Sequence, residues 1–404
     1  MQYWIINNLE ERIIAHKELS KTANRAAEIW KTTLDSEFPM AVWQLPNSPD
    51  FSMIVDLRPN LHQKEREIES IDSGFVVNRF DSIDAPEPIH IKADLSFNWN
   101  NKEVIETVDP TVAAQDLEAF QNRESKKHRS NFTPAIAQTD YRHQVMSAVD
   151  EIKAGRLQKV VLSRFEDHQL PDGFDLFNQL EILAKRYPGA MKYAIYLPGI
   201  GTWMGATPEQ LIQIHDNHVF RTVSLAGTQN LPDDVDISDI AWRQKEIEEQ
   251  AMVSRYIVDC FKKIRLREFD EKGPKTAKAG NLAHLKTEFE VDMIKTNSEN
   301  LGSIMLKLLH PTSAVCGMPL DKSLQFISAV EGYNREFYAG FLGPINYKGS
   351  TDIFVNLRCA QIGDKMARFY AGAGITIDSD PEKEYEETAM KLKTMKSVLL
   401  DQGS

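Results

Sequence analysis

The 404-residue chain has few cysteines and no long apolar run, and both features limit what it can be. Its three cysteines, Cys260, Cys316 and Cys359, fit neither a CxxC pair nor a Cys/His metal motif, which favours small core residues in a reducing compartment over a disulfide framework. No apolar stretch approaches the roughly 20 residues that a membrane-spanning helix needs. The first residues also lack a signal-peptide pattern. We therefore expect a soluble, cytoplasmic protein without a membrane partner.

Basic residues are outnumbered, with 47 lysines and arginines against 59 aspartates and glutamates and a net charge of -12. This balance argues against a nucleic-acid partner, because such a partner requires clustered basic residues. An anionic substrate would have to be held by a few cations placed close to it. The hydrophobic content of 42% and the charged content of 26% are typical of a globular protein with a large core.

The first 130 residues (1–130) carry no charged cluster with an evident chemistry, and their length is consistent with an integral part of a single core. Apolar residues at three- and four-residue steps predict a helix between Glu11 and Trp30. A polar, charged stretch at 121–131 predicts a solvated loop that leads into the second region, 131–404. Short strands are expected at 41–45, 52–57 and 74–80.

The second region has sharper patterns. Asp140 or Thr139 can cap a helix that ends near Gly155, and a strand follows at 159–165. Helices and strands then mix without a regular alternation, which favours an α+β fold over a doubly wound sheet. Further helices are expected at about 240–264, 304–309, 326–331 and 381–400, and further strands at 193–197, 201–204, 222–226, 337–345, 353–360 and 367–371.

Two of the expected helices each carry a pair of glutamates with helical spacing. Glu246 and Glu249 lie three residues apart in the first helix. Glu384 and Glu387 do so in the last helix, where Lys391 continues the same stripe. For either helix alone, a solvated charged face is the simpler interpretation. If the two pairs faced each other, they would form an all-oxygen site that suits Mg²⁺.

Small residues occur at two places where a backbone can approach a ligand closely. Gly372 and Gly374 alternate with alanines, so their N–H groups could bind an anion, although a tight strand end is an equally good interpretation. The turn 225–228 is a second, weaker example. Arg358 falls inside the expected strand 353–360 and needs an anionic partner if it points inward.

Taken in order, these stretches resemble the chorismate-binding enzymes. This family comprises isochorismate synthases, salicylate synthases, and the large subunits of anthranilate and aminodeoxychorismate synthases. The resemblance covers about residue 141 to the C-terminus and implies one large α+β domain with two antiparallel sheets flanked by helices, the active site lying between them. The motifs are KVVLSR (159–164), GATPE (205–209), SLAGT (224–228), KEIEEQ (245–250), HPTSAVCG (310–317), EGYNREFYAG (331–340), LRCA (357–360), YAGAGI (370–375) and SDPEKEYEET with Lys391 (379–391).

The resemblance also implies roles for individual residues. Glu249 and Glu387 would bind Mg²⁺ directly, and Glu246 and Glu384 would support it through bound waters. The remaining residues would bind chorismate: Gly227 and Thr228 through the ring carboxylate, Tyr338, Arg358, Gly372, Gly374 and Lys391 through the rest of the dianion, and His310 beside the ring.

Two positions distinguish the activities within the family. The resemblance suggests that water-using members have lysine at Lys159, where the ammonia-using anthranilate synthases have glutamine. A partly desolvated lysine can lose its proton and act as general base on water attacking C2. Glu209 would then be the general acid for the departing C4 hydroxyl. Ala226 stands where aminodeoxychorismate synthases carry a nucleophilic lysine, so covalent amine catalysis has no nucleophile here.

The expected function is therefore Mg²⁺-dependent, reversible conversion of chorismate to isochorismate. A salicylate synthase is the first alternative, since it catalyses the same first step and then eliminates pyruvate. An anthranilate synthase component and a non-catalytic chorismate-binding protein are weaker alternatives. Gln250 and Ser313 depart from the usual family pattern, at positions that supply no charge to the mechanism. We expect a monomer or a homodimer.

Overall fold

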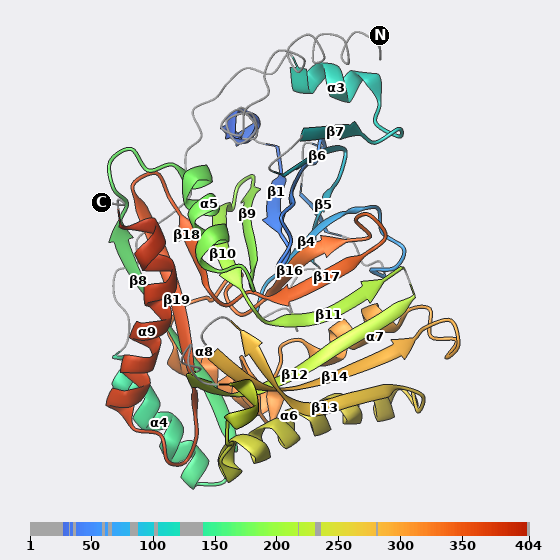
Figure 1. Ribbon diagram of the computed structural model, residues 1–404. Coiled ribbons are helices and arrows are strands. Elements are labelled where there is room, and N and C mark those ends of the chain that lie inside the picture. Colours follow the sequence, from blue (N-terminus) through green and yellow to red (C-terminus); the bar gives the residue numbers. More distant parts are fainter. Residues whose placement is uncertain are drawn as a thin grey trace.

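The computed structural model describes residues 27–31, 33–34, 38–58, 61–63, 67–80, 88–100, 104–121, 140–216, 218–230, 236–279 and 282–401. Within these residues the chain forms two large sheets in which the paired strands are antiparallel (Figure 1). The α+β expectation with two antiparallel sheets is confirmed. The expected helix before Trp30 and the expected loop after residue 121 lie largely outside the described residues.

The first sheet has ten strands, in the order β15-β8-β19-β18-β10-β9-β1-β2-β6-β7. Its strands are β1 (Met40–Gln44), β2 (Phe51–Val55), β6 (Leu95–Trp99), β7 (Val104–Val108), β8 (Lys159–Gln169), β9 (Met191–Leu197), β10 (Gly201–Thr207), β15 (Gly317–Met318), β18 (Cys359–Ile362) and β19 (Met366–Ile375).

The second sheet has nine strands, in the order β13-β14-β12-β11-β17-β16-β4-β5-β3. Its strands are β3 (His62–Gln63), β4 (Gly74–Asn78), β5 (Ile89–Lys92), β11 (Gln210–His215), β12 (Val219–Asn230), β13 (Asp270–Ala279), β14 (Leu282–Asp292), β16 (Phe341–Ile345) and β17 (Thr351–Val355). Because β1 pairs with β9 and β4 pairs with β16, strands from the first 130 residues enter both sheets.

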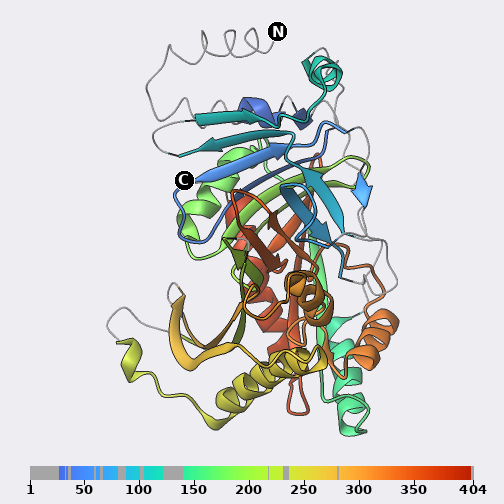
Figure 2. The same ribbon diagram turned by 90° about the vertical axis from the view of Figure 1, so that its right-hand side faces the viewer.

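Helices cover these sheets, and apolar residues fill the spaces between the layers. The helices are α3 (Ala114–Gln121), α4 (Tyr141–Lys153), α5 (Leu176–Arg186), α6 (Gln244–Lys263), α7 (Leu301–Leu309), α8 (Leu320–Val330) and α9 (Pro381–Leu399), with a short 3₁₀ turn, η1 (Ile237–Asp239). In Figure 2 the N-terminal strands lie at the top of the molecule and α6 at the bottom. No helix of the described residues is long and apolar enough to cross a membrane.

Local signals explain where α4 and α9 begin. Asp140 caps α4 by accepting a hydrogen bond from the Arg142 N–H at 3.1 Å. Asp380 caps α9 in the same way, accepting from the backbone N–H groups of Glu382 and Lys383, and Pro381 occupies the first turn. Both helix starts agree with the sequence-based expectation.

Some expected strands were wrong in their bounds. The expected strand 353–360 is two strands, because β17 ends at Val355 and β18 begins at Cys359. Arg358 therefore lies in the connection and not inside a strand. The expected strand 337–345 begins only at Phe341, and α8 begins at Leu320, earlier than expected. The split of the expected strand and the position of Arg358 have one cause, because the chain leaves the second sheet after Val355 and enters the first sheet at Cys359.

Candidate active site

Two connections between the sheets run side by side at the centre of the molecule. β10 and β11 are joined through Glu209, and β17 and β18 are joined through Arg358. The Ala206 N–H donates to the Arg358 carbonyl oxygen at 2.8 Å, and the Val355 N–H donates to the Glu209 carbonyl oxygen at 2.9 Å. These bonds hold the predicted acid and the predicted anion-binding arginine in adjacent segments.

The charged side chains at this junction affect one another. Burial raises the pKa of Glu209, while the positive charges of Arg358, Lys159 and Lys391 act in the opposite direction. Burial also lowers the pKa of Arg358, which the negative charges of Glu209 and Glu387 oppose. The structure therefore brings together these five predicted site residues. The raised pKa of Glu209 favours its protonated form, which an acid catalyst requires.

One edge of β19 completes this cluster. β19 pairs with β8 as far as Ile375, whereas its pairing with β18 stops at Phe369. The Lys391 ammonium donates to the Gly372 carbonyl oxygen at 2.8 Å. Because the N–H and C=O groups of a residue in an antiparallel strand point to the same side, the N–H groups of Gly372 and Gly374 face this edge as well.

The two glycines leave room for other site residues. A Cβ atom on Gly372 would lie 3.0 Å from the Tyr338 hydroxyl oxygen, and one on Gly374 would lie 3.0 Å from the Lys159 Cε. Tyr338 is itself buried and stacks on Tyr370 with ring centroids 5.4 Å apart. The absence of side chains at these positions thus lets Tyr338 and Lys159 reach the same edge.

Glu249 and Glu387, the two glutamates expected to bind Mg²⁺ directly, each contact a lysine. Glu249 on α6 lies 3.4 Å from the Lys159 ammonium, and Glu387 on α9 lies 2.6 Å from the Lys391 ammonium. Both lysines contact the β19 edge, so the two helices approach one place from different sides (Figure 1). In the part of the chain that the structure describes, no group of three or more His, Cys, Asp or Glu residues is arranged to hold a metal ion.

The two supporting glutamates differ in their contacts. The Glu246 carboxylate accepts a hydrogen bond from the Arg243 N–H at 2.9 Å, so it caps its own helix. Glu384 is half-buried, and its negative charge acts to raise the pKa of Lys391, which burial lowers. A capping role for Glu246 could have been read from the sequence, because it occupies the third position of α6.

Gly227 forms a β-bulge against the start of α6. The register between β12 and β14 shifts at this residue, and its φ of 65° is one that glycine adopts readily. A Cβ atom there would lie 3.1 Å from the Glu246 Cβ, so only glycine fits without movement. The bulge places the backbone of β12 under the helix that carries Glu246 and Glu249. The side chain of Thr228 lies outside the described residues.

His310 is buried among other partners. Its Nε2 atom lies 3.1 Å from the Arg79 carbonyl oxygen, and its ring packs edge-on against Phe341 with centroids 4.9 Å apart. Burial lowers the pKa of the imidazole to about 4, so the ring is neutral at physiological pH. In the described residues its Nδ1 atom has no hydrogen-bond partner. These contacts do not join it to the lysine–glutamate pairs.

Sequence reasoning missed a buried ion pair that supports the site. The Glu331 carboxylate contacts the Arg335 guanidinium at 2.5 Å and accepts a hydrogen bond from the Ser163 N–H at 2.6 Å. Arg335 donates to the Val161 carbonyl oxygen at 2.7 Å. This pair attaches the loop before Tyr338 to β8, the strand of Lys159. Opposite charges four residues apart were the available signal.

The fold and this site define a member of the chorismate-binding enzymes. The profile of the family described as "Chorismate binding enzyme" matches residues 12–400, and the chain belongs to this family. The isochorismate synthase EntC of Escherichia coli K12 is 30% identical over 296 residues, which cover 71% of this chain and 75% of that protein. The isochorismate synthase DhbC of Bacillus subtilis 168 is 29% identical over 280 residues, covering 66% and 69% respectively.

Solved structures show the same fold. The menaquinone-specific isochorismate synthase MenF of Escherichia coli superposes with a TM-score of 0.71 at 22% identity, covering 91% of both chains. Anthranilate synthase component I of Streptococcus pneumoniae gives a TM-score of 0.65 at 21% identity, covering 84% of this chain and 83% of that one.

Proposed function

We propose that the protein is an isochorismate synthase that converts chorismate reversibly to isochorismate. Family membership and the isochorismate synthases among its relatives support this choice. The observation that carries it is the environment of Glu209, whose pKa is raised by burial although Arg358, Lys159 and Lys391 are close enough to oppose the shift. A carboxyl group whose pKa is raised, placed beside a lysine, is the kind of acid–base pair that hydroxyl exchange requires.

In the proposed reaction, Lys159 takes a proton from water as the water oxygen bonds to C2 of the ring. The two ring double bonds shift, and the C4–O bond breaks. Glu209 gives its proton to the departing hydroxyl, which leaves as water. In the reverse direction the two groups exchange roles. The Lys159 side chain is 21% exposed, so water can reach it while much of the lysine is shielded.

The substrate would be held by cations and N–H groups at the β19 edge. Arg358 and Lys391 supply positive charge, and the pKa of each is lowered by burial, which indicates a desolvated setting where an anionic partner is favoured. Tyr338 and the N–H groups of Gly372 and Gly374 would complete the contacts to the chorismate carboxylates. These cations would supply local positive charge in a chain whose overall charge is -12.

A magnesium ion is part of the proposal. Glu249 and Glu387 would hold it, with Glu246 and Glu384 beside them, and their carboxylate oxygens are the donors that Mg²⁺ prefers. The two helices bring Glu249 and Glu387 to lysines at one strand edge, and this observation fits a shared cation. When bound, the ion would neutralise and orient the ring carboxylate of chorismate.

Incubation with chorismate and Mg²⁺, followed by chromatographic separation of the products, tests the function. Isochorismate is the expected product, whereas salicylate or anthranilate as the main product would overturn the proposal.

Glu249→Ala and Glu387→Ala should lose activity and the response to Mg²⁺ while remaining folded. Glu248→Ala and Glu386→Ala are matched controls, because these glutamates are exposed neighbours on the same helices. Undiminished turnover of the wild type in EDTA would contradict the magnesium site.

The cellular setting remains part of the proposal. The three cysteines are free and buried, which supports a reducing compartment such as the cytoplasm. Light scattering of the purified protein would distinguish a monomer from a homodimer.

A further inference from the structure

Helix α9 presents two neighbouring stripes of side chains. Glu384, Glu387 and Lys391 form the stripe that belongs to the candidate site. Tyr385, Thr388 and Leu392 each follow one residue later, and Thr388 and Leu392 are buried. Since one residue turns an α-helix by about 100°, whatever fixes the second stripe also sets the direction of the first.

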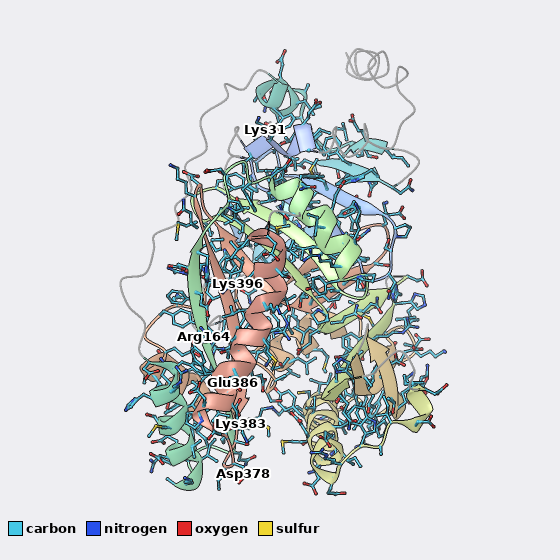
Figure 3. The ribbon with its side chains drawn as sticks, turned by 60° about the vertical axis from the view of Figure 1, so that its left-hand side comes forward. Lys31, Arg164, Asp378, Lys383, Glu386 and Lys396 are labelled. Atoms are coloured by element: carbon cyan, nitrogen blue, oxygen red, sulfur yellow. The ribbon has the colours of Figure 1, made fainter. Side chains whose placement is uncertain are left out.

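Arg164 on β8 fixes this second stripe. Its Nε atom donates to the Thr388 hydroxyl at 2.7 Å, and its guanidinium carbon lies 4.3 Å from the centroid of the Tyr385 ring. Its Nη1 atom donates to the Glu166 carboxylate at 2.8 Å, and Glu166 also contacts Lys396 of α9 at 2.7 Å. Figure 3 shows Arg164 beside α9 between the levels of Glu386 and Lys396.

The same contacts extend to α4. The Arg142 guanidinium carbon lies 3.8 Å from the centroid of the Tyr385 ring, and two guanidinium groups so close to one ring must occupy its opposite faces. The Arg164 side chain is only 6% exposed, so its hydrogen bonds form where water competes weakly. Arg164 thus joins the strand of Lys159 to the helix of Glu387 and Lys391.

We propose that Arg164 is a positioning residue, which sets the rotation of α9 and thereby directs Glu387 and Lys391 toward Lys159 and the β19 edge. The inference rests on the proposed function, because it assigns Glu387 to the metal and Lys391 to the substrate. Arg164 is not itself assigned to the metal or to the substrate. It acts through Thr388 and Tyr385.

The test compares Arg164→Met and Thr388→Val with the matched control Arg368→Met. Arg368 is also a shielded arginine over an aromatic ring, but it joins β19 to Asp167 and Phe165 on β8. The measurements are Mg²⁺ binding by titration calorimetry, the KM for chorismate, kcat and the thermal unfolding midpoint. Both test variants should bind Mg²⁺ roughly 10–100-fold more weakly, the usual effect of losing a residue that orients a metal ligand.

The KM for chorismate should rise with the loss of Mg²⁺ affinity, and kcat should change less. Arg164→Lys should recover only part of the affinity, because lysine cannot form both hydrogen bonds and the stacking contact. If Arg164→Met does not fold, Thr388→Val carries the test, because valine has nearly the shape of threonine. A merely structural role would lower the unfolding midpoint without changing Mg²⁺ affinity.

Unchanged Mg²⁺ affinity in both variants, or an equal loss in Arg368→Met, would overturn the proposal. The two hypotheses fail separately. A wild-type enzyme that forms no isochorismate refutes the proposed function, while the Mg²⁺ titrations still decide whether Arg164 positions α9.

Discussion

Two ion pairs beside β8 differ in their burial and in the distance between their charged groups. Glu331 and Arg335 are almost fully buried, touch at 2.5 Å and bond further to the backbone of β8. Lys159 and Glu249 are 21% and 43% exposed and lie 3.4 Å apart. The first pair is thus tightly bonded and the second is loosely bonded.

The difference agrees with the two proposed roles. A fully bonded buried pair holds a loop in a single position, and removing one partner leaves an uncompensated charge. A lysine that is weakly held can exchange its partner, and in its neutral amine form it can take a proton from water. We therefore expect changes to the first pair to affect stability, and changes to the second to affect turnover.

The largest expected effect follows from the acid–base pair. Lys159→Ala and Glu209→Gln should each lower kcat by ~10²–10⁴, the usual contribution of one general acid or base. Chorismate and Mg²⁺ should still bind, because neither residue is assigned to ground-state binding. Steady-state kinetics in both reaction directions measure this, and both variants should be equally impaired with isochorismate.

Lys262→Ala is the matched control, because Lys262 forms an exposed ion pair with Asp259 on α6. Lys159→Ala with nearly wild-type kcat would refute the mechanism and the choice of water over ammonia.

Breaking the buried pair should have the next largest effect. Glu331→Gln should lower the free energy of unfolding by about 3–5 kcal/mol, because Arg335 would keep a buried charge without its partner. Denaturant unfolding measures this change. Glu151→Gln breaks an exposed pair with Arg156 and should be indistinguishable from the wild type. Equal stability of the two variants would remove the distinction between the two kinds of pair.

How much of the fold and of the candidate site the sequence predicts depends on how far apart in the chain the interacting residues lie. The caps at Asp140 and Asp380 are local: Asp140 was one of the two predicted caps of its helix, and the last helix was expected to begin at residue 381. Glu246 was assigned only to a metal, although its bond to the Arg243 N–H is just as local. The pairing of β4 with β16 joins segments more than 200 residues apart, and no local pattern specifies such a partner.

The same reason explains the correction for Arg358. An apolar run predicts a strand, but it does not tell where the chain leaves one sheet for the other. That point depends on β10 and β11, which make the same crossing beside it. The motifs thus supplied the candidate site residues, whereas the junction that brings Glu209 next to Arg358 required the structure.

A smaller effect is expected from His310, which is buried yet has one ring nitrogen without a partner in the described residues. Its pKa of about 4 in the folded protein lies below the value of about 6.5 for an unfolded histidine. As the pH falls from 6.5 to 4, the histidine takes up a proton in the unfolded chain, whereas His310 stays neutral in the folded protein. Stability is therefore lost in that window, by up to about 3 kcal/mol.

Unfolding free energies of the wild type and His310→Asn between pH 4 and 7 measure this effect. The variant should lose less stability on acidification than the wild type. His143→Asn, which changes an exposed histidine of α4, should follow the wild type. Parallel curves for the wild type and His310→Asn would show that folding does not lower the pKa of His310.

The smallest expected effect is that added ammonium yields no amine product, and this prediction tests the role of Lys159. If Lys159 directs water rather than ammonia to C2, and Ala226 offers no lysine nucleophile, amine products should not form. High ammonium should therefore leave isochorismate as the main product, with neither anthranilate nor aminodeoxychorismate formed. Lys159→Gln, which removes the proposed base, should lose the water reaction. Chromatography of both enzymes with and without ammonium decides the matter. A main amine product from the wild type would mean that neither Lys159 nor Ala226 selects the nucleophile, and the loose pair with Glu249 would then need a different explanation.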